Sequence, residues 1–520
     1  MHQTRRQFLK TLGTGSAAVF ASGMLISRRS GGGQQSAPRP NILFAIADDQ
    51  SWPHAGAYGC PGINTPAFDR VAREGILFTN AFCAAPQCSP NRAAIFTGRN
   101  IGQLEEAGTH ASNFPKKFQV YPDLLEESGY EVGFTGKGWG PGNWEYNGRP
   151  RNPAGQEFSE HELQKRPYDS VRNLDYTANF RAFLNQRDPD RPFHFWYGAS
   201  EPHRSYQPGI GLQAGKKLAD VEVPAFLPDT EEIRSDILDY FVEIEWFDHH
   251  LGQMLTILEE TGELENTLVV VTSDNGMPFP RAKANLYEFG THMPLAIRWP
   301  ERVASGRVVR DLTSSIDFAP TLLEIAGVDI PAQVTGKSLS QVLFSSEEGL
   351  VDPSREWVLT GRERHTHARP DNLAYPARAL RTGQYLYIRN LAPDRWPAGN
   401  PGGSGDPPHY HDIDDSPSKT YMLEHQDDPA VCQLFHLGFG KRPLEELYDI
   451  QADPGCIHNL AGQYEYQQLQ EHLWEQLEDT LRAQHDPRAF GYEIFESYPR
   501  YSHMRDFPGF KQQGEYNFEY

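Results

Sequence analysis

Oxygen-bearing side chains follow two apolar runs of the chain. Asp48 and Asp49 come directly after the apolar residues 41–47, and Asp274 and Asn275 come after 267–273. Either motif alone is also typical of a solvated loop or a helix cap. Together, three carboxylates and an amide oxygen form a hard ligand set that suits Ca²⁺, and Mg²⁺ less well. Without a cation, the three carboxylates would repel one another and their pKa values would rise.

A thiol, a proline and an arginine stand together in the run Cys88-Ser89-Pro90-Asn91-Arg92. Taken alone, this run is typical of a buried cysteine followed by a helix with proline in its first turn. However, the run resembles the motif at which sulfatases have a cysteine oxidised to formylglycine by a sulfatase-maturing enzyme. Asn91 departs from that motif, because serine is usual at its position.

Further motifs of the sulfatase family occur in the same order along the chain. From residue 40 to the C-terminus they are Asp48-Asp49, Gly129-Tyr130, Thr135-Gly136-Lys137, Pro202-His203, Asp274-Asn275-Gly276, Lys283, Tyr287-Glu288, Gly290 and Pro294. A set of motifs in one order is far more specific than any one of them. The resemblance implies an alkaline phosphatase-like fold with a C-terminal subdomain, a formylglycine derived from Cys88, and one Ca²⁺ ion.

The resemblance also implies a role for each site residue. The implied metal ligands are Asp48, Asp49, Cys88, Asp274 and Asn275, and the implied catalytic residues are Cys88, Arg92, Lys137, His203 and Lys283. Lys137 and Lys283 would bind sulfate oxygens, and Arg92 would hold the modified cysteine. His203 would protonate the leaving group, because imidazole titrates near neutral pH.

Several segments look most like N-sulfoglucosamine sulfohydrolases within the family. They are Pro202-His203-Arg204, Met277-Pro278-Phe279-Pro280, Asn285-Leu286-Tyr287 and Tyr375-Pro376-Ala377-Arg378. This resemblance implies a sulfated amino sugar as substrate. The expected substrate contacts are Trp139, His292, His365 and Arg378. Trp139 stands where many sulfatases have a histidine, so it either stacks on a sugar ring or packs in the core.

Other functions remain open at this point. An O-sulfatase acting on another sulfated polysaccharide, or a phosphodiesterase or phosphonate hydrolase on the same fold, would share these motifs. A glycan-binding relative without activity should have lost the cysteine or the carboxylates, and this chain keeps both. A plain calcium-binding protein would leave the motif around Cys88 without an explanation.

The elements that must position these residues alternate between strand and helix. Apolar runs at 41–47, 76–82, 130–135, 193–199, 267–272 and 295–299 predict strands, and 66–75, 121–128, 231–260 and 316–325 predict helices. This alternation predicts an α/β fold with a mostly parallel sheet that helices cover on both faces. Ligands bind such sheets at the carboxyl ends of the strands, where both acidic motifs fall.

The chain divides into three predicted regions. Residues 1–36 contain the run Thr4 to Lys10 with Arg5 and Arg6, and an apolar stretch at 12–26, which predict a twin-arginine signal and a linker. We expect the catalytic domain at 37–350 and a smaller α+β subdomain at 351–520, with a hairpin at 379–389, a long loop near 393–428 and a helix near 464–482. The predicted location is periplasmic or secreted, after transport by the twin-arginine export machinery.

Overall composition excludes some partners. The formal net charge is −21, which argues against nucleic-acid binding, and no stable membrane span is expected. The anionic substrate must therefore be attracted by a local basic pocket and a metal. We expect the acidic stretch 412–415 to lie outside that pocket. Of the five cysteines, Cys432 and Cys456 are a candidate disulfide pair.

Overall fold

The fold is organised around strand β1 (Asn41–Ala47), whose seven residues are all buried. In the computed structural model, which describes residues 39–402 and 410–500, β1 lies between the parallel strands β5 (Phe193–Gly198) and β6 (Thr267–Ser273). Alternate side chains of β1 enter different hydrophobic clusters, with Ile42, Phe44 and Ile46 on one face and Leu43, Ala45 and Ala47 on the other. This is why the run is apolar throughout, as expected for a strand covered on both faces.

Nine strands form the main sheet, in the order β4-β3-β5-β1-β6-β7-β2-β8, with β9 paired to β2. The remaining strands are β2 (Ile76–Phe82), β3 (Glu131–Gly136), β4 (Gln156–Glu157), β7 (His292–Arg298), β8 (Arg307–Val309) and β9 (Thr313–Ser314). Only the β6–β7 and β2–β7 pairings are antiparallel. The predicted α/β class with a mostly parallel sheet is therefore confirmed.

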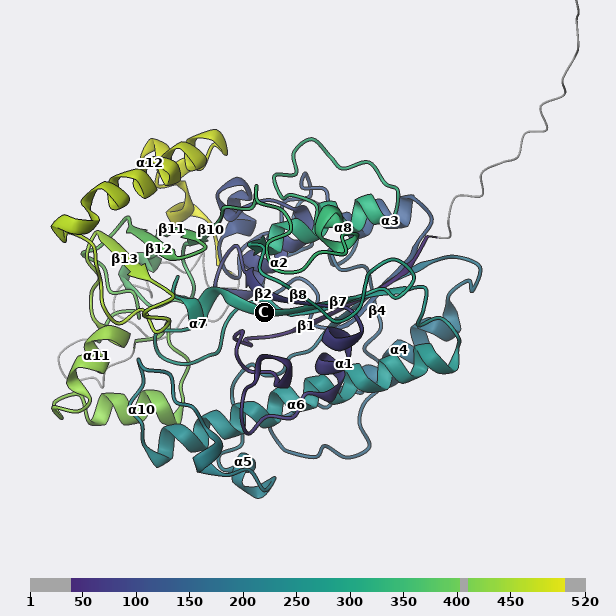
Figure 1. The fold of residues 1–520 in the computed structure, drawn as a ribbon, viewed down its shortest axis with the longest axis horizontal. Coiled ribbons are helices and arrows are strands. Elements are labelled where there is room, and N and C mark those ends of the chain that lie inside the picture. The colour runs from purple at the N-terminus through teal and green to yellow at the C-terminus, as the bar shows by residue number, and fades with distance from the viewer. Residues whose placement is uncertain (1–38, 403–409, 501–520) are drawn as a thin grey trace, which may run out of the picture. The chain divides into compact units, whose positions relative to one another are not determined.

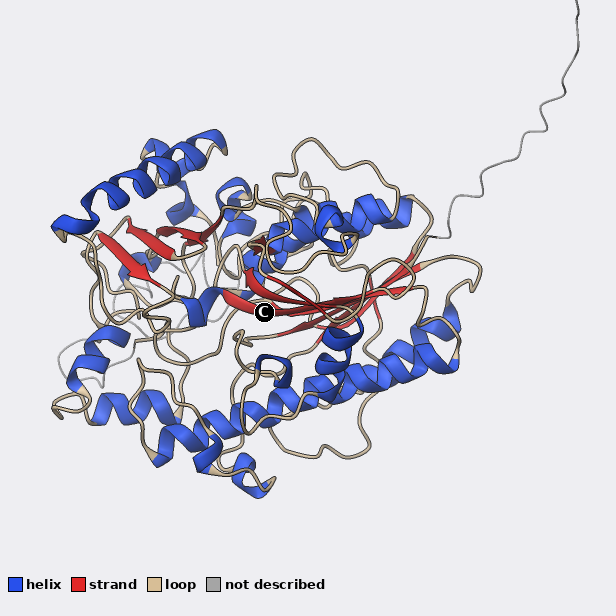
Figure 2. Cartoon of the chain, viewed as in Figure 1, coloured by secondary structure: helices blue, strands red, loops and turns tan. Residues whose placement is uncertain are grey.

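Helices cover both faces of this sheet (Figures 1 and 2). On one face lie α2 (Cys88–Thr97), α3 (Tyr121–Glu127) and α8 (Phe318–Ile325); on the other lie α1 (Pro66–Glu74), α4 (Tyr176–Gln186) and α6 (Glu231–Glu260). The predicted bounds of α6 match the structure, because Thr230 caps its start: the Thr230 side chain accepts a hydrogen bond from the Ile233 amide.

A second, antiparallel sheet has the order β10-β11-β12-β13. Its strands are β10 (Trp357–Arg362), β11 (Ala377–Thr382), β12 (Tyr385–Asn390) and β13 (Glu445–Asp449). Helix α12 (Gln467–Ala483) covers one face through Leu473, Leu477 and Leu481. The other face packs on Leu286 and Tyr287, so this small sheet supports the segment that follows Lys283. The described residues 39–402 and 410–500 belong to one compact unit.

Two expectations need correction. The segment 393–428 is not a loop throughout, because α10 (Pro417–Glu424) lies in it. Ser416 caps this short helix and Pro417 occupies its first turn, a pattern that favours helix formation. Cys432 and Cys456 are both free: Cys432 begins α11 (Cys432–Phe439), whereas Cys456 is buried among the residues of another cluster.

The twin-arginine motif and its apolar stretch lie outside the described residues. Within the described part of the chain, every helix is too short or too polar to cross a membrane.

Candidate active site

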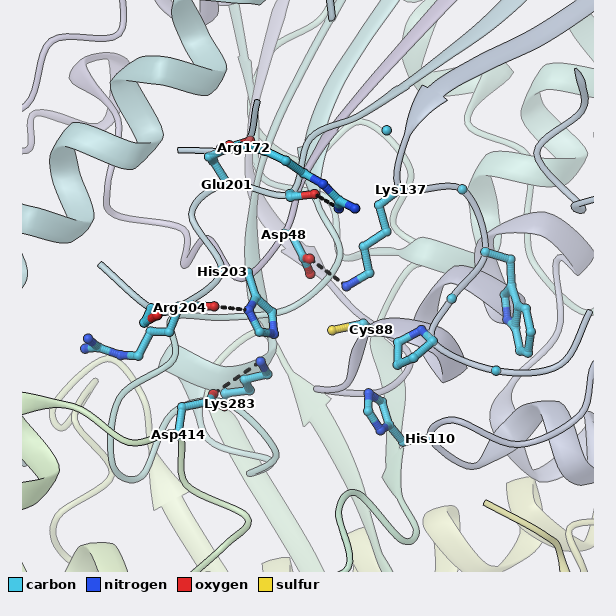
Figure 3. Close-up of a pocket in the computed structure, with 18 of the residues that line it drawn as sticks. Asp48, Cys88, His110, Lys137, Arg172, Glu201, His203, Arg204, Lys283 and Asp414 are labelled. Atoms are coloured by element: carbon cyan, nitrogen blue, oxygen red, sulfur yellow. Dashed lines mark hydrogen bonds and ion pairs between the residues drawn. The ribbon is translucent and has the colours of Figure 1, made fainter. Parts of the chain in front are cut away.

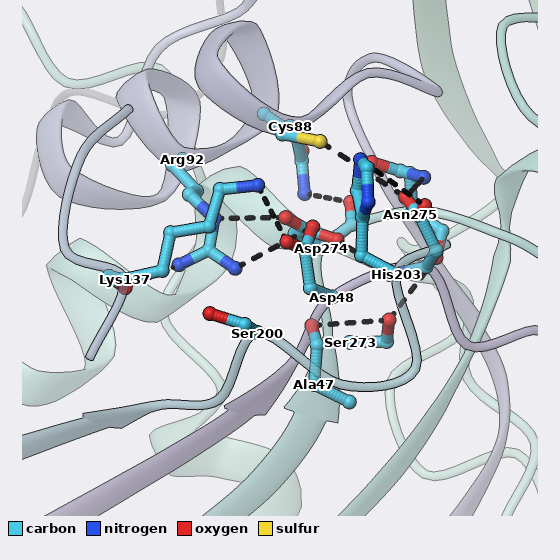
Figure 4. A network of polar contacts seen from close by, with 12 residues as sticks. Ala47, Asp48, Cys88, Arg92, Lys137, Ser200, His203, Ser273, Asp274 and Asn275 are labelled. Atoms are coloured by element: carbon cyan, nitrogen blue, oxygen red, sulfur yellow. Dashed lines mark hydrogen bonds and ion pairs between the residues drawn. The ribbon is translucent and has the colours of Figure 1, made fainter. Parts of the chain in front are cut away.

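The two acidic motifs meet at the carboxyl ends of β1 and β6 (Figure 4). Because Ala47 and Ser273 are paired in parallel register, the residues after them lie side by side. Oxygen atoms of Asp48, Asp49 and Asp274 and the Cys88 sulfur all lie within 4.8 Å of one another. Asp49 adopts a left-handed backbone conformation with φ of 79°, an unfavourable geometry for a residue other than glycine and one that is common at functional sites.

The unpaired atoms of this cluster fit a metal ion. Asp48 Oδ1 and Asn275 Oδ1 are buried and lack a hydrogen-bond partner among the described residues. Asn275 Nδ2 donates to Asp49 Oδ1 at 2.7 Å, so the amide oxygen is left to face elsewhere. Carboxylate and amide oxygens are the donors that Ca²⁺ takes in proteins. The donor set therefore suits a hard divalent cation.

Three cationic side chains neutralise the carboxylates in this structure. Lys137 Nζ lies 2.6 Å from Asp48 Oδ2, Lys283 Nζ lies 2.6 Å from Asp49 Oδ2, and Arg92 Nε lies 2.8 Å from Asp274 Oδ2. Burial alone would raise the pKa of Asp48, but Lys137, His203 and Arg92 hold this pKa below its ordinary value. Burial and the neighbouring Asp48 charge raise the pKa of Asp274 to about 7. One carboxyl of the cluster is thus poorly compensated.

Cys88 is the first residue of α2, and its Sγ lies 4.0 Å from Asp49 Oδ1. Burial and the Asp48 charge raise the pKa of the Cys88 thiol well above its ordinary value. The unmodified thiol is therefore neutral at physiological pH and a weak nucleophile. Arg92, one turn farther along the same helix, also donates from Nη1 to the Lys137 carbonyl oxygen at 2.6 Å.

Asn91, the departure from the family motif, joins α2 to the end of β6. Its Nδ2 donates to the Asp274 carbonyl oxygen at 2.5 Å, and its Oδ1 accepts from the Ala84 amide at 2.9 Å and the Ser315 hydroxyl at 2.6 Å. A serine has one side-chain oxygen and could not reach all three groups. Asn91 therefore ties the first turn of α2 to the end of β6 and to Ala84 and Ser315.

A cavity of about 780 Å³ opens beside Cys88 (Figure 3). Its lining includes the predicted residues Asp48, Cys88, Lys137, Trp139, His203, Lys283 and His365. Its size is typical of a small-ligand site. His203 Nε2 lies 3.9 Å from Asp49 Oδ2, while its Nδ1–H donates to the Arg204 carbonyl oxygen at 2.6 Å. That hydrogen bond orients the imidazole so that Nε2 can contact a ligand in the cavity.

Trp139 lines the cavity but is only 2% exposed. Its ring packs edge-on against Phe114, and its indole N–H donates to the Ser89 carbonyl oxygen at 3.0 Å. Core packing is thus the main role of Trp139 in this structure, with one edge turned to the cavity. His365 also lines the cavity, and its Nδ1 lies 3.5 Å from Asp412 Oδ1.

The other two expected substrate contacts are not among the lining residues. His292 is stacked between the rings of Trp52 and Phe82, and its Nδ1 lies 3.2 Å from Glu288. Arg378 is fully buried, with Nε 2.7 Å from Asp486 and Nη2 2.8 Å from Glu363. Internal partners already engage both side chains. We therefore leave them out of the substrate site.

Several residues that line the cavity were not expected from the sequence, and three of them carry groups that could contact a ligand. His110, Arg172 and Asp414 face the cavity (Figure 3). His110 Nδ1–H donates to the His365 carbonyl oxygen at 3.1 Å, and the next amide, of Ala111, donates to Ser89 Oγ at 3.0 Å. This second hydrogen bond connects the segment that contains His110 to Ser89, the residue after Cys88. No local sequence pattern predicts such a contact.

Asp414 corrects the expectation that the acidic stretch 412–415 lies outside the pocket. Asp414 Oδ2 lies 3.2 Å from Lys283 Nζ, and this ion pair holds the carboxylate at the edge of the cavity. Its neighbour Asp412 is buried beneath Arg362, Arg369 and Thr366. Only Asp415 of these three has a well-exposed side chain, at 88%.

A cysteine at the start of a helix, a buried oxygen-rich cluster that fits a metal ion, and basic side chains meet at the strand ends of a mostly parallel sheet, an arrangement suited to hydrolysis of an anionic ester. The sulfatase family model matches residues 40–328, which contain the cysteine, the acidic cluster and these basic side chains. The chain belongs to the sulfatase family, and it is a hydrolase that acts on sulfate esters or sulfamates.

Curated relatives resemble nearly the whole chain. It is 30% identical over 488 residues to human N-sulphoglucosamine sulphohydrolase, covering 86% of this chain and 91% of that protein. It is 25% identical to an N-acetylglucosamine-6-O-sulfatase of Bacteroides thetaiotaomicron, covering 87% and 88%. It is 28% identical to an ulvan-active sulfatase of Formosa agariphila, covering 86% and 81%.

A solved structure in complex with its substrate D-glucosamine-2-N,6-O-disulfate has the same fold. Its TM-score is 0.64 at 23% identity, and the match covers 86% of this chain and 99% of that one. The predicted fold and family are both confirmed by these comparisons.

Proposed function

We propose that this protein removes sulfate from a sulfated glycan, and that its preferred unit is an amino sugar such as N-sulfoglucosamine. The observation that carries the proposal is the meeting of Cys88 with Asp48, Asp49 and Asp274 within 4.8 Å, beside Lys137 and Lys283. A relative that is 30% identical over 488 residues is named for N-sulfoglucosamine, which supports the sugar.

Two groups would complete this site. A Ca²⁺ ion held by Asp48, Asp49, Asp274, Asn275 and the oxygen of a modified Cys88 would supply positive charge for sulfate oxygens. A formylglycine at position 88 would supply a hydroxyl nucleophile that the neutral thiol cannot. The orphaned Asp48 Oδ1 and Asn275 Oδ1 support the metal, and the Cys-x-Pro-x-Arg spacing supports the modification by a maturing enzyme.

The side chains of this protein would then bind the sulfate and move a proton. Lys137 and Lys283 would exchange part of their contact with Asp48 and Asp49 for sulfate oxygens. Arg92 would keep residue 88 and the Lys137 loop in place through its bonds to Asp274 and the Lys137 carbonyl. His203 would deliver a proton from Nε2 to the leaving nitrogen or oxygen, since its Nδ1 is fixed by the Arg204 carbonyl.

A second candidate is an O-sulfatase on another sulfated glycan. It is supported by the resemblance to the N-acetylglucosamine-6-O-sulfatase and to the ulvan-active sulfatase. The same site could also serve phosphodiesters or phosphonates. Rates of hydrolysis on matched sulfate and phosphate esters would separate these: a sulfatase should be faster on the sulfate by about two orders of magnitude or more.

Mass spectrometry of the peptide that contains residue 88 tests the proposal directly. In protein produced together with a sulfatase-maturing enzyme, the peptide should carry an aldehyde in place of the thiol. The same preparation should release sulfate from glucosamine N-sulfate faster than from O-sulfated galactose. Full activity in protein whose residue 88 is still an unmodified cysteine would refute the mechanism.

We also propose that the protein is exported as a folded chain by the twin-arginine machinery and acts in the periplasm or outside the cell. The order of Arg5, Arg6 and the apolar stretch 12–26 supports this. Replacing both arginines by lysine should leave the protein in the cytoplasmic fraction of an expressing bacterium, whereas continued export would contradict the proposal.

A further inference from the structure

Asp414 is held firmly in the wall of the cavity by its neighbours in sequence. The Asp412 carboxylate before it is bound by Arg362 Nη2 at 2.9 Å and by the Thr366 amide at 2.8 Å. The Ile413 carbonyl oxygen accepts a hydrogen bond from Lys419 Nζ at 2.8 Å. Because both preceding residues are anchored, the backbone at Asp414 is held at the wall of the cavity, and Lys283 pairs with its side chain there.

The Asp414 carboxylate is charged and only half engaged. Its Oδ2 pairs with Lys283 at 3.2 Å, while its Oδ1 accepts no hydrogen bond from the described residues. The side chain is 27% exposed to the cavity. Burial alone would raise the pKa of Asp414, but Lys283, His203 and His365 hold this pKa below its ordinary value. The carboxylate is therefore ionised across the physiological pH range.

The other carboxylates that line the described cavity are placed differently. Asp48 belongs to the metal cluster. Glu201 is satisfied on both oxygens, by the Arg172 amide at 2.8 Å and the Tyr176 hydroxyl at 2.8 Å. Glu157 and Asp169 have exposed side chains, where water and salt screen their charge. Asp414 alone combines partial burial with a free oxygen, next to the lysine that would bind sulfate.

We infer that Asp414 determines specificity: it accepts a hydrogen bond from a hydroxyl or amino group of the bound sugar and rejects a second sulfate there. The favoured ligand is then a saccharide unit with a single sulfate in the cavity, and not a polysulfated unit. A sulfate that approached Asp414 would meet a like charge in a partly dehydrated place, where water screens it poorly. A hydroxyl or amino donor would instead satisfy Oδ1. This inference rests on the proposed function only in taking the ligand to be a sulfated sugar.

Binding measurements test the inference without turnover. Calcium-loaded protein with Cys88→Ser is titrated calorimetrically with glucosamine N-sulfate and with glucosamine carrying a second sulfate at O3 or O6. With Asp414 present, the singly sulfated sugar should bind about ten-fold or more tightly than either disulfated one. Asp414→Asn, which keeps the shape and removes the charge, should reduce that ratio about ten-fold.

Two controls belong to the same experiment. Asp427→Asn removes an exposed carboxylate from another part of the same subdomain and should leave the ratio unchanged. Asp414→Glu restores the charge and should restore the preference. If Asp414→Asn does not fold, Asp414→Ser replaces it, because it also removes the charge and should reduce the preference in the same way.

The outcomes separate this inference from the proposed function. Equal or tighter binding of both disulfated sugars, or a ratio that Asp414→Asn leaves unchanged, overturns the role of Asp414. Binding with the expected preference, together with no sulfate release by the matured parent enzyme, overturns the proposed function and upholds the role of Asp414.

Discussion

Lys283 contacts two carboxylates at once, Asp49 at the metal cluster and Asp414 at the cavity wall. Such shared partners run through the whole site. Arg92 serves both Asp274 and the Lys137 carbonyl, and Asn91 serves three groups. Single substitutions here will therefore disturb more than the contact they remove, and each needs a control elsewhere in the chain.

His110 supplies an imidazole to a cavity that lacks one at position 139. The His365 carbonyl oxygen engages its Nδ1–H, which leaves Nε2 available to accept a proton or hydrogen bond beside Cys88. We expect His110→Ala to lower kcat about 100-fold with little change in melting temperature. His472→Ala, at an exposed position of α12, is the control. A normal kcat in His110→Ala would show that this imidazole takes no part in turnover.

Arg378 should prove structural. Removing it leaves Asp486 buried without its ion-pair partner and leaves Glu363 with Arg488 alone, which costs about 3–5 kcal/mol. We expect Arg378→Ala to lower the free energy of unfolding by roughly that amount and to leave KM unchanged in the fraction that stays folded. Urea titration and steady-state kinetics measure the two effects. A raised KM at full stability would return Arg378 to the substrate site.

At the level of elements, the ends of β3 and β5 control the Lys137 loop. A Cβ added to Gly198 would overlap the Lys137 carbonyl oxygen, to which Arg92 also donates. We expect Gly198→Ala to cost about 1–3 kcal/mol of folding free energy and to lower activity sharply by displacing Lys137. Gly383→Ala, where nothing lies within 4 Å of the new methyl, should change neither property. Chemical denaturation and sulfate release would check both variants, and equal behaviour of the two would contradict this account.

Local patterns predicted most of the sheet and the inner site. The strand at Ile76–Phe82 and the helix Glu231–Glu260 have the expected bounds, because each has a clear apolar pattern and clear ends. The meeting of the two acidic motifs could also be predicted, since each follows a strand and parallel strands bring their carboxyl ends together. Asp414 was misplaced because its position depends on Lys283, 131 residues earlier, and on a buried ion cluster. No periodicity encodes such a contact.

At the level of the whole molecule, the acidic cluster links metal binding to stability. We expect removal of Ca²⁺ by a chelator to lower the melting temperature. Adding back Ca²⁺ at about 100 times its Kd should raise the free energy of unfolding by about 2.7 kcal/mol. Differential scanning calorimetry with matched Ca²⁺ and Mg²⁺ concentrations measures this. A melting temperature that is unchanged by chelation would argue against a resident ion.

The pH dependence of that effect has a definite sign. The pKa of Asp274 is about 7 in the metal-free protein, above its ordinary value of 3.8. Such a carboxyl binds its proton more tightly in the folded state than in the unfolded state. The free energy of unfolding of the metal-free protein should therefore fall as pH rises from about 4 to 7. Ca²⁺ needs the ionised form, so the stabilisation it provides should grow with pH and level off above about 7. Calorimetric melts between pH 5 and 8, with and without Ca²⁺, measure the increase in melting temperature that Ca²⁺ causes. An increase that becomes smaller as pH rises would contradict this expectation.

The groups proposed to carry out turnover and the group proposed to select the sugar have separate supports. Cys88 begins helix α2, and Asp48 and Asp274 follow strands β1 and β6 of the central sheet. The position of Asp414 depends instead on the ion pair between Arg362 and Asp412, beside the small sheet. We therefore expect a mutation in the 410–415 segment to change which glycan is accepted while the elements that carry Cys88, Asp48 and Asp274 stay in place, although Lys283 contacts both the acidic cluster and Asp414. Evolution can in this way retune such an enzyme for new sulfated polymers by small steps, and an engineer can use the same segment as a library site.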